Sequence, residues 1–319
     1  MVKRRVFAWL TAVDACWFYR IKLPLEELAK TGEWEISWGS PPADIHDYDV
    51  VIGQRIPYDS PEWLALCADS NVLTVYEMDD DLLHIDPENT VPYEVYQSLL
   101  PFIKKNVEAA DVVVTCTPYA AERMLELNKN VHILPICTLP ELIDLPLRTR
   151  TDLLTVGWAG SPFHHQDWQT LPLQLAEFKR RVPRASLHMM GADYTQGLAG
   201  HVRVTGLQHV EAYYAAIDFD IGLAPLLRSN HNRGKSHTKL LEYASRGVPA
   251  VATAWGQYVD WIDDGVNGFL VHNDDEWVDA LVALSNDSLR GLMSAAARNK
   301  ARQFTIDQHI HLWKAALGG

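Results

Sequence analysis

The feature that most constrains the fold is a regular alternation of short apolar runs with longer amphipathic stretches. This rhythm is typical of parallel sheets covered by helices, because parallel strands need crossover connections and are buried on both faces. In the first half of the chain the expected strands are Val6–Leu10, Asp49–Ile52, Leu73–Tyr76, Val112–Cys116 and Val131–Leu134. The expected helices are Leu25–Lys30, Pro61–Ala68, Tyr93–Ala109 and Tyr119–Leu127.

A second series follows the segment Leu139–Thr151, whose prolines and lack of any period predict a linker. Its expected strands are Thr155–Trp158, Ser186–Met190, Val202–Thr205, Phe219–Ala224 and Ala250–Thr253. Its expected helices are Asp167–Arg181, Val210–Ala216, Ser236–Arg246, Asp275–Leu284, Asp287–Arg302 and Ile306–Ala316. With 319 residues the chain exceeds the length at which one core usually stops growing, so two domains are expected.

The predicted fold class is α/β, with two Rossmann-like doubly wound domains. The first domain is expected over residues 1–145 and the second over residues 146–303, and a last helix, 304–319, is expected to pack back on the first domain. Doubly wound sheets bind ligands at the carboxyl ends of their strands, so the two domains are expected to face a central cleft there.

Composition limits the classes of partner. The net charge of −13, from 41 acidic and 28 basic residues, argues against a large footprint on nucleic acid or anionic membranes. The four cysteines form no CxxC pair and are expected to be reduced, which favours a cytoplasmic protein. No apolar run approaches the length needed to span a bilayer, so we expect a soluble chain.

The most informative stretch is Arg233–Pro249, in which a small-residue loop leads into a helix that Gly247 ends. At about 100° per residue Lys235, Lys239 and Glu242 share one stripe of this helix. Charged stripes are usually solvated faces. This one starts at the helix N-terminus, however, where free N–H groups and the macrodipole favour an anion. The pattern therefore favours a phosphate site.

At these residues the chain resembles the retaining glycosyltransferases of the GT-B fold, group 1 (family 4). Lys235-Ser236, Lys239–Ala244 and Gly247–Pro249 match the donor-site helix of one branch. Further matches in the second half are Gly157–Pro162 with His164 and Asp167, and the late turn Asp264–Val271. Looser matches in the expected acceptor domain are Tyr19–Ile21, Gln54-Arg55 and Tyr76–Leu82. The resemblance implies that the first domain takes the acceptor and the second a nucleotide sugar.

The resemblance also implies individual roles in the donor domain. Glu242 is expected to accept hydrogen bonds from the donor ribose, since a carboxylate is acceptor-only and a diol offers two donors. The family's glutamate eight positions earlier is replaced by Gly234. Residues 160–166 contain no Arg or Lys, so Lys235 and Lys239 are expected to stabilise the leaving diphosphate. The further expected donor-binding residues are Gly160, Ser161, His164, Arg233, Ser236, His237 and Thr238.

An acidic run, residues 77–81, follows the strand Leu73–Tyr76 at its carboxyl end. It is compatible with a metal site or with acids at a helix start. The resemblance favours a third interpretation, in which Asp79 or Asp80 orients or deprotonates the acceptor hydroxyl and neither a metal nor another cofactor is bound. Arg20 and Arg55 are candidate acceptor-binding residues; contact with the donor phosphate and ordinary surface arginines are the alternatives.

The sequence thus predicts a retaining glycosyltransferase that moves a sugar from a nucleoside-diphosphate sugar to a hydroxyl group. A non-catalytic nucleotide-sugar-binding module and an epimerase-like enzyme on the same fold stay open, whereas a phosphorylase-like enzyme is disfavoured because its cofactor-lysine context is not found. A nicotinamide-dependent enzyme is disfavoured, because no GxGxxG follows the first strand. The acceptor stays open among glycan, small metabolite, protein and hydroxylated DNA base, the last being disfavoured by charge.

Overall fold

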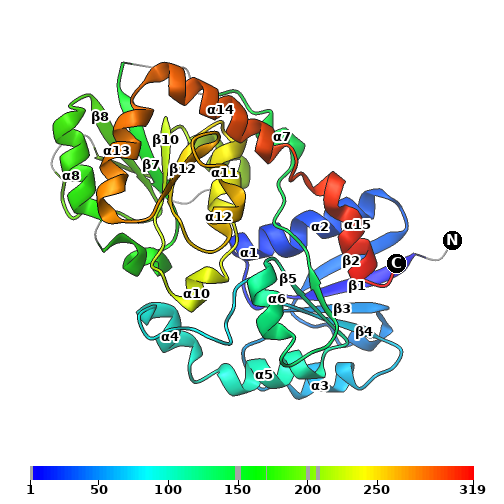
Figure 1. The fold of residues 1–319 in the computed structure, drawn as a ribbon. Coiled ribbons are helices and arrows are strands. Elements are labelled where there is room, and N and C mark those ends of the chain that lie inside the picture. The colour runs from blue at the N-terminus through cyan, green and yellow to red at the C-terminus, as the bar shows by residue number, and fades with distance from the viewer. Residues whose placement is uncertain (1–2, 148–151, 170, 199–201, 206–208) are drawn as a thin grey trace. The chain divides into compact units, whose positions relative to one another are not determined.

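The computed structural model describes residues 3–147, 152–169, 171–198, 202–205 and 209–319 (Figure 1). The chain forms two compact units. The first unit comprises Met1–Cys137, Arg233–Ser236 and Thr305–Gly319, and the second comprises Thr138–Asn232 and His237–Phe304. Each unit contains its own parallel sheet, which confirms the predicted α/β class.

The sheet of the first unit has the strand order β2-β1-β3-β4-β5-β6, and every pair is parallel. Its strands are β1 (Arg4–Trp9), β2 (Trp34–Gly39), β3 (Val50–Gln54), β4 (Leu73–Glu77), β5 (Val112–Thr115) and β6 (Val131–Ile133). Its helices are α1 (Ala15–Trp17), the π-helix η1 (Phe18–Lys22), α2 (Leu23–Lys30), the short 3₁₀ turn η2 (Ile45–Asp47), α3 (Pro61–Cys67), α4 (Thr90–Tyr96), α5 (Leu100–Ala109), α6 (Pro118–Met124) and α15 (Ile306–Ala316), which packs on α2 (Figure 1).

Local signals explain most of these boundaries. Thr117 caps α6 by accepting a hydrogen bond from the Ala120 N–H at 3.0 Å, and Pro118 occupies the first turn, where its missing N–H costs nothing.

The single helix expected over Tyr93–Ala109 is wrong. Two helices occupy that range, and Pro101 lies in the first turn of the second, α5, because proline cannot continue a helix interior.

The sheet of the second unit has the order β12-β11-β10-β7-β8-β9, again entirely parallel. Its strands are β7 (Leu154–Ala159), β8 (Ala185–Met190), β9 (Val202–Thr205), β10 (Ile221–Ala224), β11 (Ala250–Thr253) and β12 (Gly268–Val271). Its helices are α7 (Pro140–Ile143), the 3₁₀-helix η3 (Pro162–Trp168), α8 (Leu171–Arg181), α9 (Val210–Ala216), α10 (Asn230–Arg233, whose last residue groups with the first unit), α11 (Thr238–Ser245), α12 (Gln257–Trp261), α13 (Asp274–Leu284) and α14 (Asp287–Ala301).

Strand order reverses between β7 and β10, and such switch points are where doubly wound sheets bind ligands. Close packing beside this point depends on small residues. A Cβ on Gly157 would lie 2.1 Å from the ring of Phe219, so glycine is required there.

The helix expected over Asp167–Arg181 is wrong at its start, because residues up to Trp168 form η3 and α8 begins at Leu171.

Two strands were missed by sequence reasoning, β2 and β12. Both are edge strands. In β2 apolar residues alternate with polar or small ones, the pattern of a half-buried strand, and in β12 the apolar run comprises only residues 269–271, so neither presents a long apolar run. Part of the expected linker, Pro140–Ile143, is helical, and residues 148–151 of it lie outside the described ranges.

All four cysteines are free thiols. Among the described residues, none of the helices has the length and apolar character required to cross a bilayer.

Candidate functional site

The candidate donor helix is α11, which begins two residues later than predicted, at Thr238. Lys235 therefore precedes the helix and does not share its stripe. Every residue from Lys239 to Ser245 is buried. Burial of Lys239 and Glu242 excludes a solvated charged face, because charged side chains are buried only where they are paired or functional.

Glu242 lies on α11 with only 6% of its surface exposed. One of its carboxylate oxygens accepts a hydrogen bond of 2.6 Å from the hydroxyl of Tyr213, on α9. Burial, followed by the charge of Glu242, holds the pKa of Tyr213 well above its usual value, so Tyr213 stays a donor. The carboxylate is thus fixed in one orientation in a dry environment, where a further hydrogen bond to it is strong.

Lys239, one turn earlier, is 8% exposed. Its ammonium donates a hydrogen bond to the backbone carbonyl of Ala159, the last residue of β7, and lies 4.8 Å from the ring centroid of Trp158. Gly160 follows directly. A Cβ there would lie 2.5 Å from Trp158 and 3.0 Å from the Lys239 ammonium, so only glycine fits between strand and helix.

The loop after β7 carries His164, and Ser161 precedes its 3₁₀-helix η3. The ring nitrogen Nδ1 of His164 lies 2.7 Å from a carboxylate oxygen of Asp167. The other oxygen of Asp167 accepts hydrogen bonds from the Leu227 N–H (2.8 Å) and the Asn232 side chain (2.7 Å). Asp167 therefore fixes the loops after β7 and β10 to one another and orients the imidazole.

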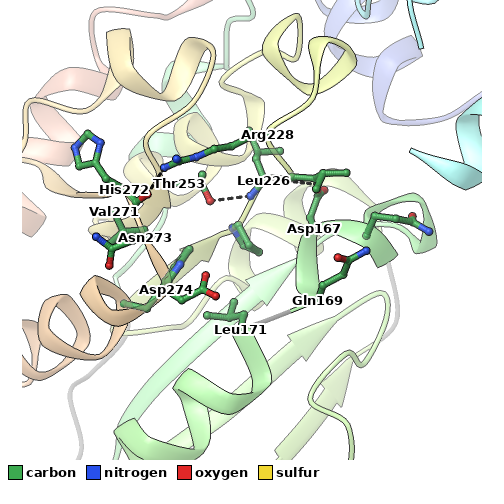
Figure 2. A pocket seen from close by; sticks show the side chains of 14 residues that line it. Asp167, Gln169, Leu171, Leu226, Arg228, Thr253, Val271, His272, Asn273 and Asp274 are labelled. Carbon is green, nitrogen blue, oxygen red and sulfur yellow. Dashed lines mark hydrogen bonds between the residues drawn. The ribbon is translucent and has the colours of Figure 1, made fainter. Parts of the chain in front are cut away.

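A hollow of about 300 Å³ opens at the carboxyl ends of β10, β11 and β12, beside this carboxylate. Figure 2 shows Asp167 on one side of it and His272 and Asn273 on the other. The Leu226 N–H donates to the Thr253 hydroxyl at 3.0 Å and closes the floor. The hollow and His164 thus share one supporting residue, Asp167.

The loop before α11 groups with the first unit. The guanidinium of Arg233 lies 5.0 Å from the ring centroid of Tyr119, and the Gly234 carbonyl accepts a hydrogen bond of 3.1 Å from Thr117. The Lys235 ammonium lies 3.8 Å from a carboxylate oxygen of Asp80. The structure therefore brings Lys235 to the acidic loop. Its neighbour Ser236 is half-buried in the same loop.

His237 has a packing role in the second unit. Its ring stacks on Trp261 with centroids 4.4 Å apart, and Nδ1 lies 3.1 Å from the Gln257 side-chain oxygen. Thr238 is the first residue of α11 and is half-buried. These contacts place His237 at the helix N-terminus as a cap-position residue with an apolar partner.

The acidic loop follows β4 in the first unit. Asp79 is 7% exposed, and one of its oxygens lies 3.9 Å from a guanidinium nitrogen of Arg55. A second guanidinium nitrogen of Arg55 lies 2.8 Å from Asp14. Arg55 has a φ of 46°, which is uncommon and strained for a residue with a side chain. Arg55 is therefore held between two carboxylates beside the expected acceptor-handling acids.

Arg20 differs from its expected place, since it is fully buried. It lies in the π-helix η1, bonds the Glu77 carboxylate at 2.7 Å and donates to the Leu134 carbonyl. Burial raises the pKa of Glu77 above its ordinary value, against the attraction of Arg20. The guanidinium also lies 5.3 Å from the ring of Trp313, on α15. In this structure Arg20 holds the first unit together, and its acceptor-binding role stays a prediction.

No cluster of three or more His, Cys, Asp or Glu side chains suited to a metal occurs in the part of the chain that the structure describes. Asp81, the third acid of the loop, instead accepts a hydrogen bond of 3.0 Å from the Leu83 N–H. Metal independence stays a prediction.

A comparison with family models decides what kind of domain the second unit contains. The model described as glycosyl transferases group 1 matches residues 151–287. Residues 151–287 are thus similar to the group 1 glycosyltransferases. This match confirms the family that the sequence of the donor helix resembles, while a search of curated proteins finds no significant match.

Solved structures share the GT-B fold. Anabaena HepE in complex with UDP-glucose is 14% identical with a TM-score of 0.71, covering 98% of this chain and 99% of that one. WaaG, a glycosyltransferase involved in lipopolysaccharide biosynthesis, is 15% identical with a TM-score of 0.69, covering 99% and 100%. S. aureus TarM is 14% identical with a TM-score of 0.64 over 85% of this chain, which spans 55% of the TarM chain's length. At these identities the likeness shows the fold alone.

Sequence reasoning gave no role to two supporting residues of the candidate donor site. Tyr213, which orients Glu242, lies 29 positions earlier in the chain, and no pattern links the two residues. Tyr243, whose hydroxyl accepts a hydrogen bond from the Ala159 N–H at the end of β7, was expected only as part of the motif. The Asp167 carboxylate was quoted in the resemblance, and its spacing of three from His164 was the one available signal.

Proposed function

We propose that this chain transfers a sugar from a nucleoside-diphosphate sugar to a hydroxyl acceptor. The observation that carries the proposal is Glu242, a buried carboxylate on α11, the helix that packs against the switch point of a sheet in the region similar to the group 1 glycosyltransferases. Because Tyr213 holds one oxygen, the carboxylate is ready to accept the hydroxyls of a ribose without reorganisation. HepE, a structural neighbour, has been solved with UDP-glucose, which supports a nucleotide-sugar donor.

In this proposal the diphosphate is bound by backbone N–H groups at the start of α11 and near Gly160-Ser161, with His164 beside them. Retention of the anomeric configuration follows from the resemblance of the donor helix to retaining enzymes. The acceptor attacks the face that the leaving diphosphate vacates, and the diphosphate helps to take its proton. Charge then grows on the leaving group, and Lys235 is the proposed cation that stabilises it.

The experiment that tests this function is a thermal-shift and hydrolysis panel of UDP-, GDP- and ADP-sugars. A ligand that binds only the folded state raises the melting temperature by mass action. We expect one nucleotide class to stabilise the protein and its sugar to be released slowly to water. If no member of the panel binds, the proposed donor is wrong.

A second candidate, a non-catalytic nucleotide-sugar-binding module, is favoured by Gly234, which stands where the family has a glutamate. The Gly234 carbonyl accepts a hydrogen bond of 3.1 Å from the Thr117 hydroxyl. Glycine offers no side chain that could contact the sugar as the family's glutamate does. Stabilisation by a nucleotide sugar without release of sugar to water or to a pool of hydroxyl compounds would support this candidate over the first.

The double substitution Asp79→Asn with Asp80→Asn is expected to lower sugar transfer by about 10²- to 10⁴-fold, the usual contribution of a general base. The amides keep the shape of the side chains but cannot take a proton. The rate is measured as nucleoside-diphosphate release in a pool of hydroxyl acceptors, with and without chelator, and we expect chelator to have no effect. The matched control is Asp59→Asn, which removes an exposed carboxylate 3.0 Å from Lys105. Activity lost in chelator and restored by magnesium would overturn the metal-free interpretation.

A further inference from the structure

The backbone of Ala159, the last residue of β7, is bonded at both of its polar groups by α11. Its N–H donates to the hydroxyl of Tyr243 at 3.0 Å, and its carbonyl accepts from the ammonium of Lys239. Lys239 and Tyr243 are four positions apart, which places them on one face of the helix, one turn from each other. The helix therefore holds one residue of the sheet by both of its backbone polar groups, which belong to two consecutive peptide groups.

The need for these bonds follows from the topology. β7 pairs with β10 only at Val156 and Gly157, although it stays paired with β8 as far as Ala159. Beyond Gly157 the two strands separate, and their facing backbone groups would lack partners. The Tyr243 hydroxyl fills that gap, because it also donates to the Leu223 carbonyl on β10 at 3.1 Å.

The space for this ring is built into the sheet. Tyr243 is fully buried, and a Cβ on Gly222 would lie 2.4 Å from its ring. The ring also packs edge-on against Phe219, with centroids 5.7 Å apart. Burial raises the pKa of Tyr243 well above its usual value, so the hydroxyl keeps its proton and can both donate and accept.

We propose that Lys239 and Tyr243 form a clamp on Ala159 that sets the position of the Gly160 loop, and that both are positioning residues for the donor diphosphate. This inference rests on the proposed function and changes the role expected for Lys239. Its ammonium bonds the strand and covers Trp158, so its charge orients backbone instead of contacting the leaving group directly. The neighbouring Glu242 then binds ribose while the clamp fixes the adjoining phosphate loop.

The test is Tyr243→Phe, which removes one hydroxyl and leaves the ring. The matched control is Tyr76→Phe in the first unit, because the Tyr76 hydroxyl is also buried and donates to a backbone carbonyl, that of Ile56, at 2.9 Å. We expect both variants to lose thermal stability, Tyr243→Phe the more, because its hydroxyl makes two hydrogen bonds and that of Tyr76 makes one. The nucleotide used is UDP, GDP or ADP, whichever binds the parent. Only Tyr243→Phe should raise its dissociation constant, by about tenfold, as measured by calorimetry. Hydrogen exchange of the peptide around Ala159 should rise in that variant alone.

A double-variant cycle separates the clamp from a direct phosphate contact. Since both side chains act on the backbone of one residue, Lys239→Met with Tyr243→Phe should weaken nucleotide binding little more than the worse single variant. Losses that add would show that Lys239 contacts the diphosphate independently and would overturn the clamp. Unchanged exchange at Ala159, or equal affinity in the parent and Tyr243→Phe, would overturn it as well. A parent that binds none of the three nucleotides would instead contradict the proposed function itself.

Discussion

Replacement of Arg20 by methionine is expected to destabilise the protein by about 3 to 5 kcal/mol, the usual cost of removing one partner from a buried ion pair. Arg20 and Glu77 are both fully buried, and their atoms lie 2.7 Å apart. Without the guanidinium, Glu77 would have to stay charged in a dry environment or take a proton. The Leu134 carbonyl and the face of Trp313 would also lose their cation.

Urea unfolding followed by fluorescence measures the effect. Arg180→Met is the matched control: its guanidinium bonds Glu177 at 2.8 Å but is 72% exposed, so the loss should stay below about 1 kcal/mol. Combining Arg20→Met with Glu77→Met should restore much of the stability, because a buried pair replaced by apolar side chains is often neutral. A loss below 1 kcal/mol in Arg20→Met would mean that the pair does not support the fold.

The central strands were predictable because they are buried on both faces. Runs such as Val112–Thr115 contain only residues that favour strands, and caps such as Thr117 mark the helix starts. The edge strand β2 is partly exposed and carries polar residues, so no continuous apolar run marks it. The central strands therefore give the clearest signal, whereas of the edge strands β6 and β9 were predicted and β2 and β12 were not.

The candidate site was predictable only where its residues are close in the chain. Spacing on one helix links Lys239 with Glu242, and a spacing of three links His164 with Asp167. Contacts set by tertiary structure, such as that of Arg20 with Glu77 across 57 positions, leave no pattern. Lys235 illustrates the same limit. Because α11 begins two residues later than predicted, Lys235 lies before the helix and contacts Asp80 of the acidic loop instead of sharing the helix stripe.

The largest expected effect on binding is that of Glu242→Ala, which should weaken the nucleotide by about 2 to 3 kcal/mol, the value of a charged hydrogen bond in a closed site. Calorimetry with the nucleoside diphosphate that binds the parent measures it, and this loss corresponds to roughly 30- to 150-fold in Kd. The removed carboxylate would also leave the Tyr213 hydroxyl without its acceptor.

Two further variants separate the ribose contact from general disturbance of the site. Tyr213→Phe keeps the carboxylate but removes a bond that orients it, so the loss of affinity should be smaller, because the cost is one of orientation. Glu177→Ala removes a surface glutamate of the same unit that bonds Arg180 and Arg181, and it should leave affinity unchanged. An affinity within twofold of the parent in Glu242→Ala would remove this residue from the donor site. The structure instead predicts that nucleotide affinity falls from the parent to Tyr213→Phe and falls further in Glu242→Ala. Orientation by the tyrosine can matter only if the carboxylate itself binds the ribose.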